Sequence, residues 1–141
     1  MTFDIIDKLK DTYNQMGYEN LASLSEVYTD DVVFIDPFHR VENLTALIRH
    51  FESLYQNLRS IHFEYIDEMT TRNNALLTWR MDFSHRSIRK GRIISVTGAT
   101  HLKFNEKIFY HHDYFDTSTM LFEHLPVIGI ILKWIRKRIS T

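Results

Sequence analysis

Charged side chains recur two residues apart in the second half of the chain. Arg80 and Asp82 form one such pair, and His111 and Asp113 form another. Residues two apart lie on one face of a β-strand, so the members of each pair would project together. A further carboxylate, Asp36, follows an apolar run and precedes a proline. Carboxylates that share an apolar site with a guanidinium acquire different pKa values, which supplies a general base and a general acid from one residue type.

The spacing of apolar residues indicates which elements must position these side chains. Apolar residues three and four apart predict helices over residues 3–16, 20–28 and 43–58. A β-branched run, and the alternation that starts after residue 60, predict strands over 32–35, 61–69, 75–85, 92–104 and 107–115. Short turns join the last four strands, which are therefore expected to be antiparallel neighbours. Helices followed by strands indicate an α+β fold, with the helices packed on one face of a curved antiparallel sheet.

Strand alternation leaves two interpretations of which sheet face encloses a cavity. One face combines apolar residues with a polar set, namely Arg80, Asp82, Thr100, His111 and Asp113. The opposite face carries large apolar side chains, namely Trp79, Met81, Phe83, Tyr110 and Tyr114. Apolar walls with a few convergent polar groups are typical of a ligand pocket, whereas in the other interpretation the polar face is solvated and the aromatic face is core. If the polar set lines the cavity, the aromatic face needs a cover, and we expect a homodimer through the sheet.

Three short motifs and the order of elements resemble the cone-shaped superfamily of nuclear transport factor 2, ketosteroid isomerase, SnoaL-like polyketide cyclases and limonene epoxide hydrolase. The motifs lie at residues 30–37, 77–82 and 112–116, and the likeness extends over residues 3 to 125. It implies a cystatin-like α+β barrel, in which a curved antiparallel sheet wraps around the N-terminal helices and encloses an apolar cavity. It also favours the face that carries Arg80 and Asp82 as the lining of that cavity.

The resemblance also implies roles for individual residues. Asp36 matches the general base of the isomerases. Arg80, Asp82 and Asp113 match the triad of the hydrolases, in which Asp113 would activate water and Asp82 would protonate the leaving oxygen. The chain departs from the hydrolases at Phe34, which lacks the hydroxyl that their tyrosine uses to hold water. We expect ligand contacts from Phe34, Val96, Thr100, His111 and Phe115.

These residues predict a small-molecule enzyme or ligand-binding domain that acts without a cofactor on an apolar, oxygen-bearing compound. Its acid–base chemistry would be that of an epoxide hydrolase, an isomerase or a cyclase. The alternatives are a non-catalytic binding module and a protein-interaction domain of the same fold. No metal site is predicted, because none of the eight histidines stands in a His-x-x-x-His pair and the chain has no cysteine.

Composition argues against several other classes of protein. The 141 residues predict one domain over residues 1–141, and the net charge of −1 argues against nucleic-acid binding. The first residues lack the apolar core of a signal peptide, and the longest apolar run is too short to cross a bilayer, so we expect a cytoplasmic protein. Residues 117–139 are basic and amphipathic, and we expect a helical tail that forms a lid or packs on the sheet, rather than one that lies on a membrane surface.

Overall fold

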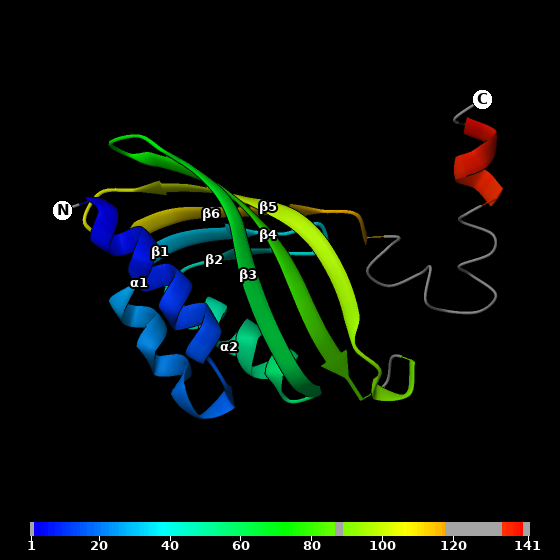
Figure 1. Ribbon diagram of the computed structural model, residues 1–141. Helices are drawn as coiled ribbons and strands as arrows, with labels where there is room; N and C mark the ends of the chain where they lie inside the picture. Colours follow the sequence, from blue (N-terminus) through cyan, green and yellow to red (C-terminus); the bar gives the residue numbers. More distant parts are fainter. Residues whose placement is uncertain (1, 87–88, 118–133, 140–141) are drawn as a thin grey trace.

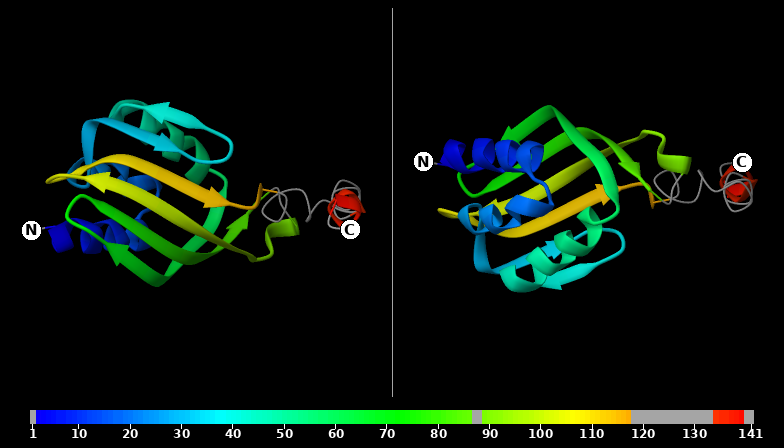
Figure 2. Two further views of the ribbon diagram at one scale, coloured as in Figure 1. Left: turned by 90° about the horizontal axis from the view of Figure 1, so that it is seen from above. Right: turned by 90° about the horizontal axis from the view of Figure 1, so that it is seen from below.

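The computed structural model describes residues 2–86, 89–117 and 134–139, and it shows helices on one face of a six-stranded sheet (Figures 1 and 2). The helices are α1 (Thr2–Gln15), the 3₁₀ helix η1 (Tyr18–Glu26), α2 (Leu44–Tyr55) and the 3₁₀ helix η2 (Arg89–Gly91). The strands are β1 (Tyr28–Ile35), β2 (Arg40–Glu42), β3 (Leu58–Thr70), β4 (Asn74–His85), β5 (Ile94–Phe104) and β6 (Ile108–Phe115). The predicted α+β fold is therefore confirmed.

The sheet is curved and open, with strand order β2-β1-β6-β5-β4-β3. Strands β3 to β6 are antiparallel neighbours, as the short turns predict, and β1 is parallel to β6. Strand β2 was not predicted, because its three residues are too few to show an alternation. It pairs with β1 in an antiparallel hairpin, and the two sheet edges are β2 and β3. The pairing of β3 with β4 shifts register between Tyr65 and Asp67, which marks a bulge in β3.

Both α-helices bury an apolar stripe against the concave side of the sheet. The buried stripe of α1 contains Ile5, Ile6, Leu9 and Tyr13. The buried stripe of α2 contains Leu44, Leu47, Phe51 and Tyr55. Asn43 starts α2, because its side-chain oxygen accepts a hydrogen bond from the backbone N–H of Ala46 at 2.9 Å. These stripes hold α1 and α2 over the sheet, so that side chains from both helices reach its inner face.

The face of β4 that points toward the helices is the one that the family resemblance placed on the outside. Trp79, Met81 and Phe83 are 3%, 8% and 4% exposed and form a core cluster with residues of β5. Trp79 lies opposite Gly98, and Met81 lies opposite Val96. Burying three large apolar side chains contributes several kcal/mol, at about 1.5–3 kcal/mol for each. This gain decides the orientation of the strand.

Arg80 and Asp82 consequently lie on the outer face, and the prediction that they line the cavity is wrong. The Arg80 guanidinium is 3.2 Å from the Asp82 carboxylate and 3.3 Å from the Glu64 carboxylate. The Ser95 hydroxyl and then Arg80 lower the pKa of Asp82. Burying this charged pair in the apolar interior would cost free energy that its exposed position avoids. A shift of one residue moves every side chain of a strand to the opposite face of the sheet, and the short motif did not reveal which face points inward.

The outer face of the sheet carries fewer large apolar residues than the sequence predicted. Trp79, Met81 and Phe83 point inward, whereas Tyr114 is exposed on the outer face and Tyr110 is half-buried there. The homodimer through this face stays a prediction.

The predicted tail over residues 117–139 lies largely outside the described residues, although residues 134–139 are helical. Within the described ranges, no helix has both the length and the apolar character needed to cross a membrane.

Substitution of Gly98 tests the packing of the inner face. A Cβ at Gly98 would collide with the Trp79 ring and lie 2.7 Å from the Tyr114 carbonyl oxygen. We predict that Gly98→Ala lowers the free energy of unfolding by about 1–3 kcal/mol in urea denaturation, because neither the ring nor the backbone can move freely. Gly17→Ala is the matched control, since a Cβ there meets only a side-chain oxygen at 4.0 Å. Equal losses in the two variants would contradict this packing.

Candidate functional site

A cavity of about 130 Å³ lies between the inner face of the sheet and helices α1 and α2. Its walls are mainly aromatic and aliphatic, and include Phe34, Phe51, Phe63, Trp79, Met81 and Phe115. The carboxylates and imidazoles in the lining are Asp36, Asp113, His39 and His50. Apolar walls with a few polar groups at fixed positions are the usual form of a small-molecule site.

Asp113, on β6, ends a chain of buried hydrogen bonds. The Tyr13 and Tyr28 hydroxyls are 2.6 Å apart, and the Tyr28 hydroxyl is 2.8 Å from Nδ1 of His111. Nε2 of His111 is 2.8 Å from Oδ1 of Asp113. An ionised carboxylate can only accept, so Nε2 carries a proton, and in the neutral imidazole Nδ1 then accepts from Tyr28. Tyr13 then donates to Tyr28, and every member of the chain is satisfied.

Burial fixes the protonation of the two tyrosines in this chain. It raises the pKa of Tyr13 well above the ordinary value of 10, and Tyr28 and Asp113 raise it further. Burial likewise raises the pKa of Tyr28, against a smaller opposing effect of the Tyr13 hydrogen bond. Both hydroxyls therefore stay protonated at neutral pH and can act as donors, which is the state that the hydrogen-bond chain requires.

A second chain of donors reaches the same carboxylate oxygen from β4 and β5. The Trp79 indole N–H donates to Oγ1 of Thr100 at 2.8 Å, and the Thr100 hydroxyl donates to Oδ1 of Asp113 at 2.6 Å. Thr100 lies directly opposite Asp113 in the β5–β6 register. Because two donors hold Oδ1, the carboxylate is fixed in orientation, with the side chain at the cavity wall.

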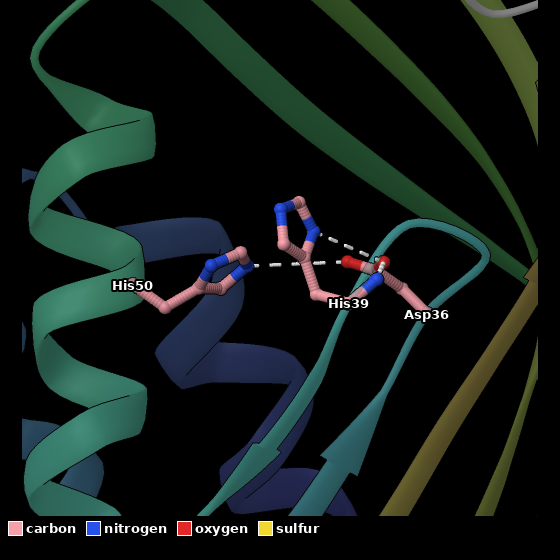
Figure 3. A group of neighbouring side chains, drawn as sticks. All are labelled: Asp36, His39 and His50. Atoms are coloured by element: carbon pink, nitrogen blue, oxygen red, sulfur yellow. Dashed lines mark hydrogen bonds and ion pairs between the residues drawn. The ribbon is translucent and has the colours of Figure 1, made fainter.

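A second set of polar side chains, Asp36, His39 and His50, lies where the cavity approaches solvent, between the β1–β2 turn and α2 (Figure 3). Oδ1 of Asp36 accepts the backbone N–H groups of Phe38 and His39, both at 2.8 Å. Nδ1 of His39 is 3.4 Å from Oδ1 of Asp36, and Nε2 of His50 is 3.9 Å from Oδ2. Burial, and next the neighbouring His39, lower the pKa of His50, while Asp36 opposes them.

The parallel pairing of β1 with β6 brings the two carboxylates to one end of the sheet. Phe34 lies opposite His111 in this pairing. Asp36 and Asp113 each follow two residues later, Asp36 directly after β1 and Asp113 near the end of β6, so they share the inner face. Both line the cavity. A ligand in the cavity would therefore meet two carboxylates within an otherwise apolar wall.

The predicted catalytic residues are divided between the two faces of the sheet. Asp36 and Asp113 line the cavity, whereas Arg80 and Asp82 form their ion pair on the outer face. The structure therefore does not assemble the hydrolase-like triad of Arg80, Asp82 and Asp113.

The predicted ligand contacts fall into three groups. Phe34 and Phe115 line the cavity. Thr100 and His111 lie deeper, in a small recess behind it, where they hold the carboxylate. Val96 is 2% exposed and packs in the core cluster behind the lining, so it supports the wall without reaching the cavity.

Several site residues were not predicted from the sequence. Tyr13 lies on the predicted apolar stripe of the first helix, so its burial could be expected but the partner of its hydroxyl could not. That partner, Tyr28, starts a strand 15 residues later. His39 and His50 lie in a turn and on a helix, and no periodic spacing connects them. Only the fold brings them to Asp36.

Substitution of Thr100 tests the donor chain from Trp79 to Asp113. Thr100→Val keeps the shape of the side chain but leaves the buried indole N–H without its acceptor and Asp113 without one donor. We predict a loss of about 1–3 kcal/mol in the free energy of unfolding, measured by urea denaturation. Thr97→Val, at an exposed position of the same strand, should change it by less than about 0.5 kcal/mol. An unaffected Thr100→Val variant would show that the chain does not stabilise the fold.

Alkaline pH should destabilise the protein through its buried tyrosines. Burial raises the pKa values of Tyr13, Tyr28, Tyr55 and Tyr65 above 10 in the folded chain. Their contribution to stability is complete below pH 10 and is lost as the pH rises above it, because the unfolded chain then releases protons that the folded chain retains. We predict that phenolate absorbance rises together with the loss of circular dichroism. Tyr55→Phe should move this alkaline transition to higher pH, and an unmoved transition would contradict the assignment.

Known proteins share this arrangement of helices and sheet. A candidate SnoaL-like polyketide cyclase from Shewanella putrefaciens is 18% identical, with a TM-score of 0.70 over 83% of this chain and 90% of its own. A nuclear transport factor 2-like protein of unknown function from Burkholderia pseudomallei is 11% identical, with a TM-score of 0.73 over 84% and 92%. A protein with a ketosteroid isomerase-like fold from Catenulispora acidiphila, in complex with trimethylamine, is 12% identical, with a TM-score of 0.73 over 85% and 90%.

These TM-scores establish a common fold, and a match to a sequence family establishes the family. No curated protein matches the chain. The sequence pattern of the SnoaL-like domain matches residues 9–111, a range that includes the second half of α1, the β1–β2 turn, α2 and the start of β6. Since this match covers most of the chain, the protein belongs to the family of SnoaL-like domains.

Proposed function

We propose that this protein is a small-molecule enzyme in which Asp113 acts as a base on an apolar, carbonyl-bearing compound held in the cavity. The observation that carries the proposal is the convergence of two buried donor chains on one oxygen of Asp113. The carboxylate is fixed at an apolar wall, which is the arrangement expected of a positioned general base. The SnoaL-like family, and the likeness to a candidate polyketide cyclase, support chemistry of this class.

The step that fits this geometry is proton transfer from a carbon next to a carbonyl group. Oδ1 of Asp113 is held by Thr100 and His111, so Oδ2 would take the proton. The C–H bond breaks, and its electron pair moves to the carbonyl oxygen to give an enolate. In an isomerisation, Asp113 returns the proton to another carbon. In a ring closure, the enolate carbon attacks a second carbonyl of the same molecule, and the new alkoxide takes the proton.

The hydrogen-bond chain behind Asp113 has a defined part in this step. His111 donates through Nε2 and is itself fixed by the Tyr28 hydroxyl at Nδ1. The imidazole therefore holds the carboxylate without competing for the substrate proton. Tyr13 and Tyr28 stay protonated because burial raises their pKa values, so the chain keeps its direction while Asp113 gains and loses a proton.

The enolate oxygen would need a donor on the opposite side of the ligand. The imidazoles of His39 and His50 line the cavity beside Asp36, and a ring N–H from either can serve as that donor. Asp36, which matches the base of the isomerases by resemblance, would be a second site for the migrating proton. Hydrolysis of an epoxide is less well supported, because Arg80 and Asp82 lie on the outer face and Phe34 has no hydroxyl.

Matched carboxylate variants test the role of Asp113. We predict that Asp113→Asn folds but loses about 10²–10⁴-fold in turnover, because an amide keeps the shape and cannot take a proton. Asp82→Asn makes the same substitution on the outer face and should retain turnover. The assay screens wild type and both variants on a panel of β,γ-unsaturated ketones and epoxides, with thermal unfolding as the check of folding.

Three outcomes would argue against this proposal. Equal activity of Asp113→Asn and wild type would remove Asp113 from the mechanism. Loss of epoxide hydrolysis in Asp82→Asn would favour the hydrolase-like alternative. If a Trp134→Phe variant binds the ketones, detected by quenching of Trp79 fluorescence, but wild type turns over none of the panel, the protein would be a non-catalytic binding module.

A further inference from the structure

We infer that Asp36, His39 and His50 form a binding site for a divalent transition-metal ion at the solvent side of the cavity (Figure 3). Each side chain offers one ligand atom, and these three atoms lie within 4.8 Å of one another. Asp36 and His39 come from the β1–β2 turn, and His50 comes from helix α2. The inference does not rest on the proposed role of Asp113, and an ion bound here would take the place of the His39 or His50 ring N–H beside the enolate oxygen.

The separations between these side chains suit an ion better than direct hydrogen bonds. His50 Nε2 is 3.9 Å from Asp36 Oδ2, which is too long for a hydrogen bond, and His39 Nδ1 is 3.4 Å from Oδ1. Ligands about 2.0–2.1 Å from a tetrahedral Zn²⁺ ion lie about 3.3 Å from each other. Small rotations of the two imidazoles would therefore bring both nitrogens and one carboxylate oxygen to this geometry.

Asp36 is held in place as the carboxylate ligand by its own turn. Its Oδ1 accepts the N–H groups of Phe38 and His39 at 2.8 Å. Backbone hydrogen bonds between Asp36 and His39, at 2.9 Å and 3.3 Å, close the same turn. These contacts orient Oδ2 toward His50, and hydrogen bonds that orient a ligand commonly govern the affinity of a metal site.

Neighbouring aromatic rings support the two imidazole ligands. The centroid of the His50 ring lies 4.6 Å from that of His39, 5.9 Å from that of Phe34 and 5.6 Å from that of Phe51. The side chain of His50 is 17% exposed and that of Asp36 is 13% exposed, whereas that of His39 is 53% exposed. An ion can therefore enter past His39 and remain screened from water on its inner side.

The donor set defines the class of ion and leaves a position for a ligand. Two imidazoles and one carboxylate suit Zn²⁺ and other first-row divalent ions better than Ca²⁺ or Mg²⁺, which prefer oxygen ligands. Three protein ligands leave at least one coordination position open. All three residues line the cavity, so an oxygen atom of a bound compound can occupy that position.

Metal titration of the full chain tests this site. The chain is treated with a chelator, dialysed and titrated with ZnCl₂ by calorimetry, and CoCl₂ is added separately as an absorption probe of coordination. We expect one saturable site, and a loss of at least about 10- to 100-fold in Zn²⁺ affinity for His50→Gln and for Asp36→Asn. The double variant His39→Gln/His50→Gln should lose the cobalt absorption band.

His101→Gln is the matched control, because His101 and His112 pair across β5 and β6 on the outer face. This variant should keep the affinity of the wild type, and so should Asp113→Asn, which separates the metal site from the proposed base. The inference is overturned if wild type shows no saturable Zn²⁺ binding. It is also overturned if the folded double variant, checked by circular dichroism, binds Zn²⁺ as tightly as wild type, or if only His101→Gln weakens binding.

Discussion

The interior of this domain depends on the hydrogen bonds that Oδ1 of Asp113 accepts. His111 of β6 and Thr100 of β5 donate directly to this oxygen, and each is connected to further donors. Through Trp79, Tyr28 and Tyr13, the same oxygen is coupled to β4, β1 and α1. Asp113 is half-buried, and withdrawing a carboxylate from water without such partners would cost free energy. The packing of five elements and the position of the carboxylate at the cavity wall therefore depend on each other.

The class and order of the elements could be predicted because each has a strong local signal. The helix over 43–58 was predicted from its apolar stripe and ends three residues early, since β3 already starts at Leu58. The faces of β5 and β6 followed from alternation, and Thr100 and His111 are buried as that alternation allows. The face of β4 was predicted wrongly, because alternation gives two faces and a three-residue motif outweighed the apolar content of Trp79 and Met81.

The site was only partly predictable because its polar groups are joined by tertiary contacts. Asp36 and Asp113 were identified singly, but their common position depends on the parallel pairing of β1 with β6. Such a pairing joins strands from opposite ends of the chain, and no local spacing reports it. The approach of His50 to Asp36 depends in the same way on how α2 crosses the sheet. The residue types thus identified candidate site residues, and the topology of the fold determines which of them lie close together.

The open edge at β3 also bears on how the protein avoids aggregation. This strand is 13 residues long, and an unpaired edge of that length is a template for another chain. It is interrupted by the bulge next to Tyr65, and it carries Glu64, Asp67 and Glu68. Glu68 is also held by Lys10 of α1 at 2.6 Å, which draws the edge toward the helix. Charge and irregular geometry therefore protect the open edge from edge-to-edge polymerisation, while Ile61 and Phe63 of the same strand line the cavity.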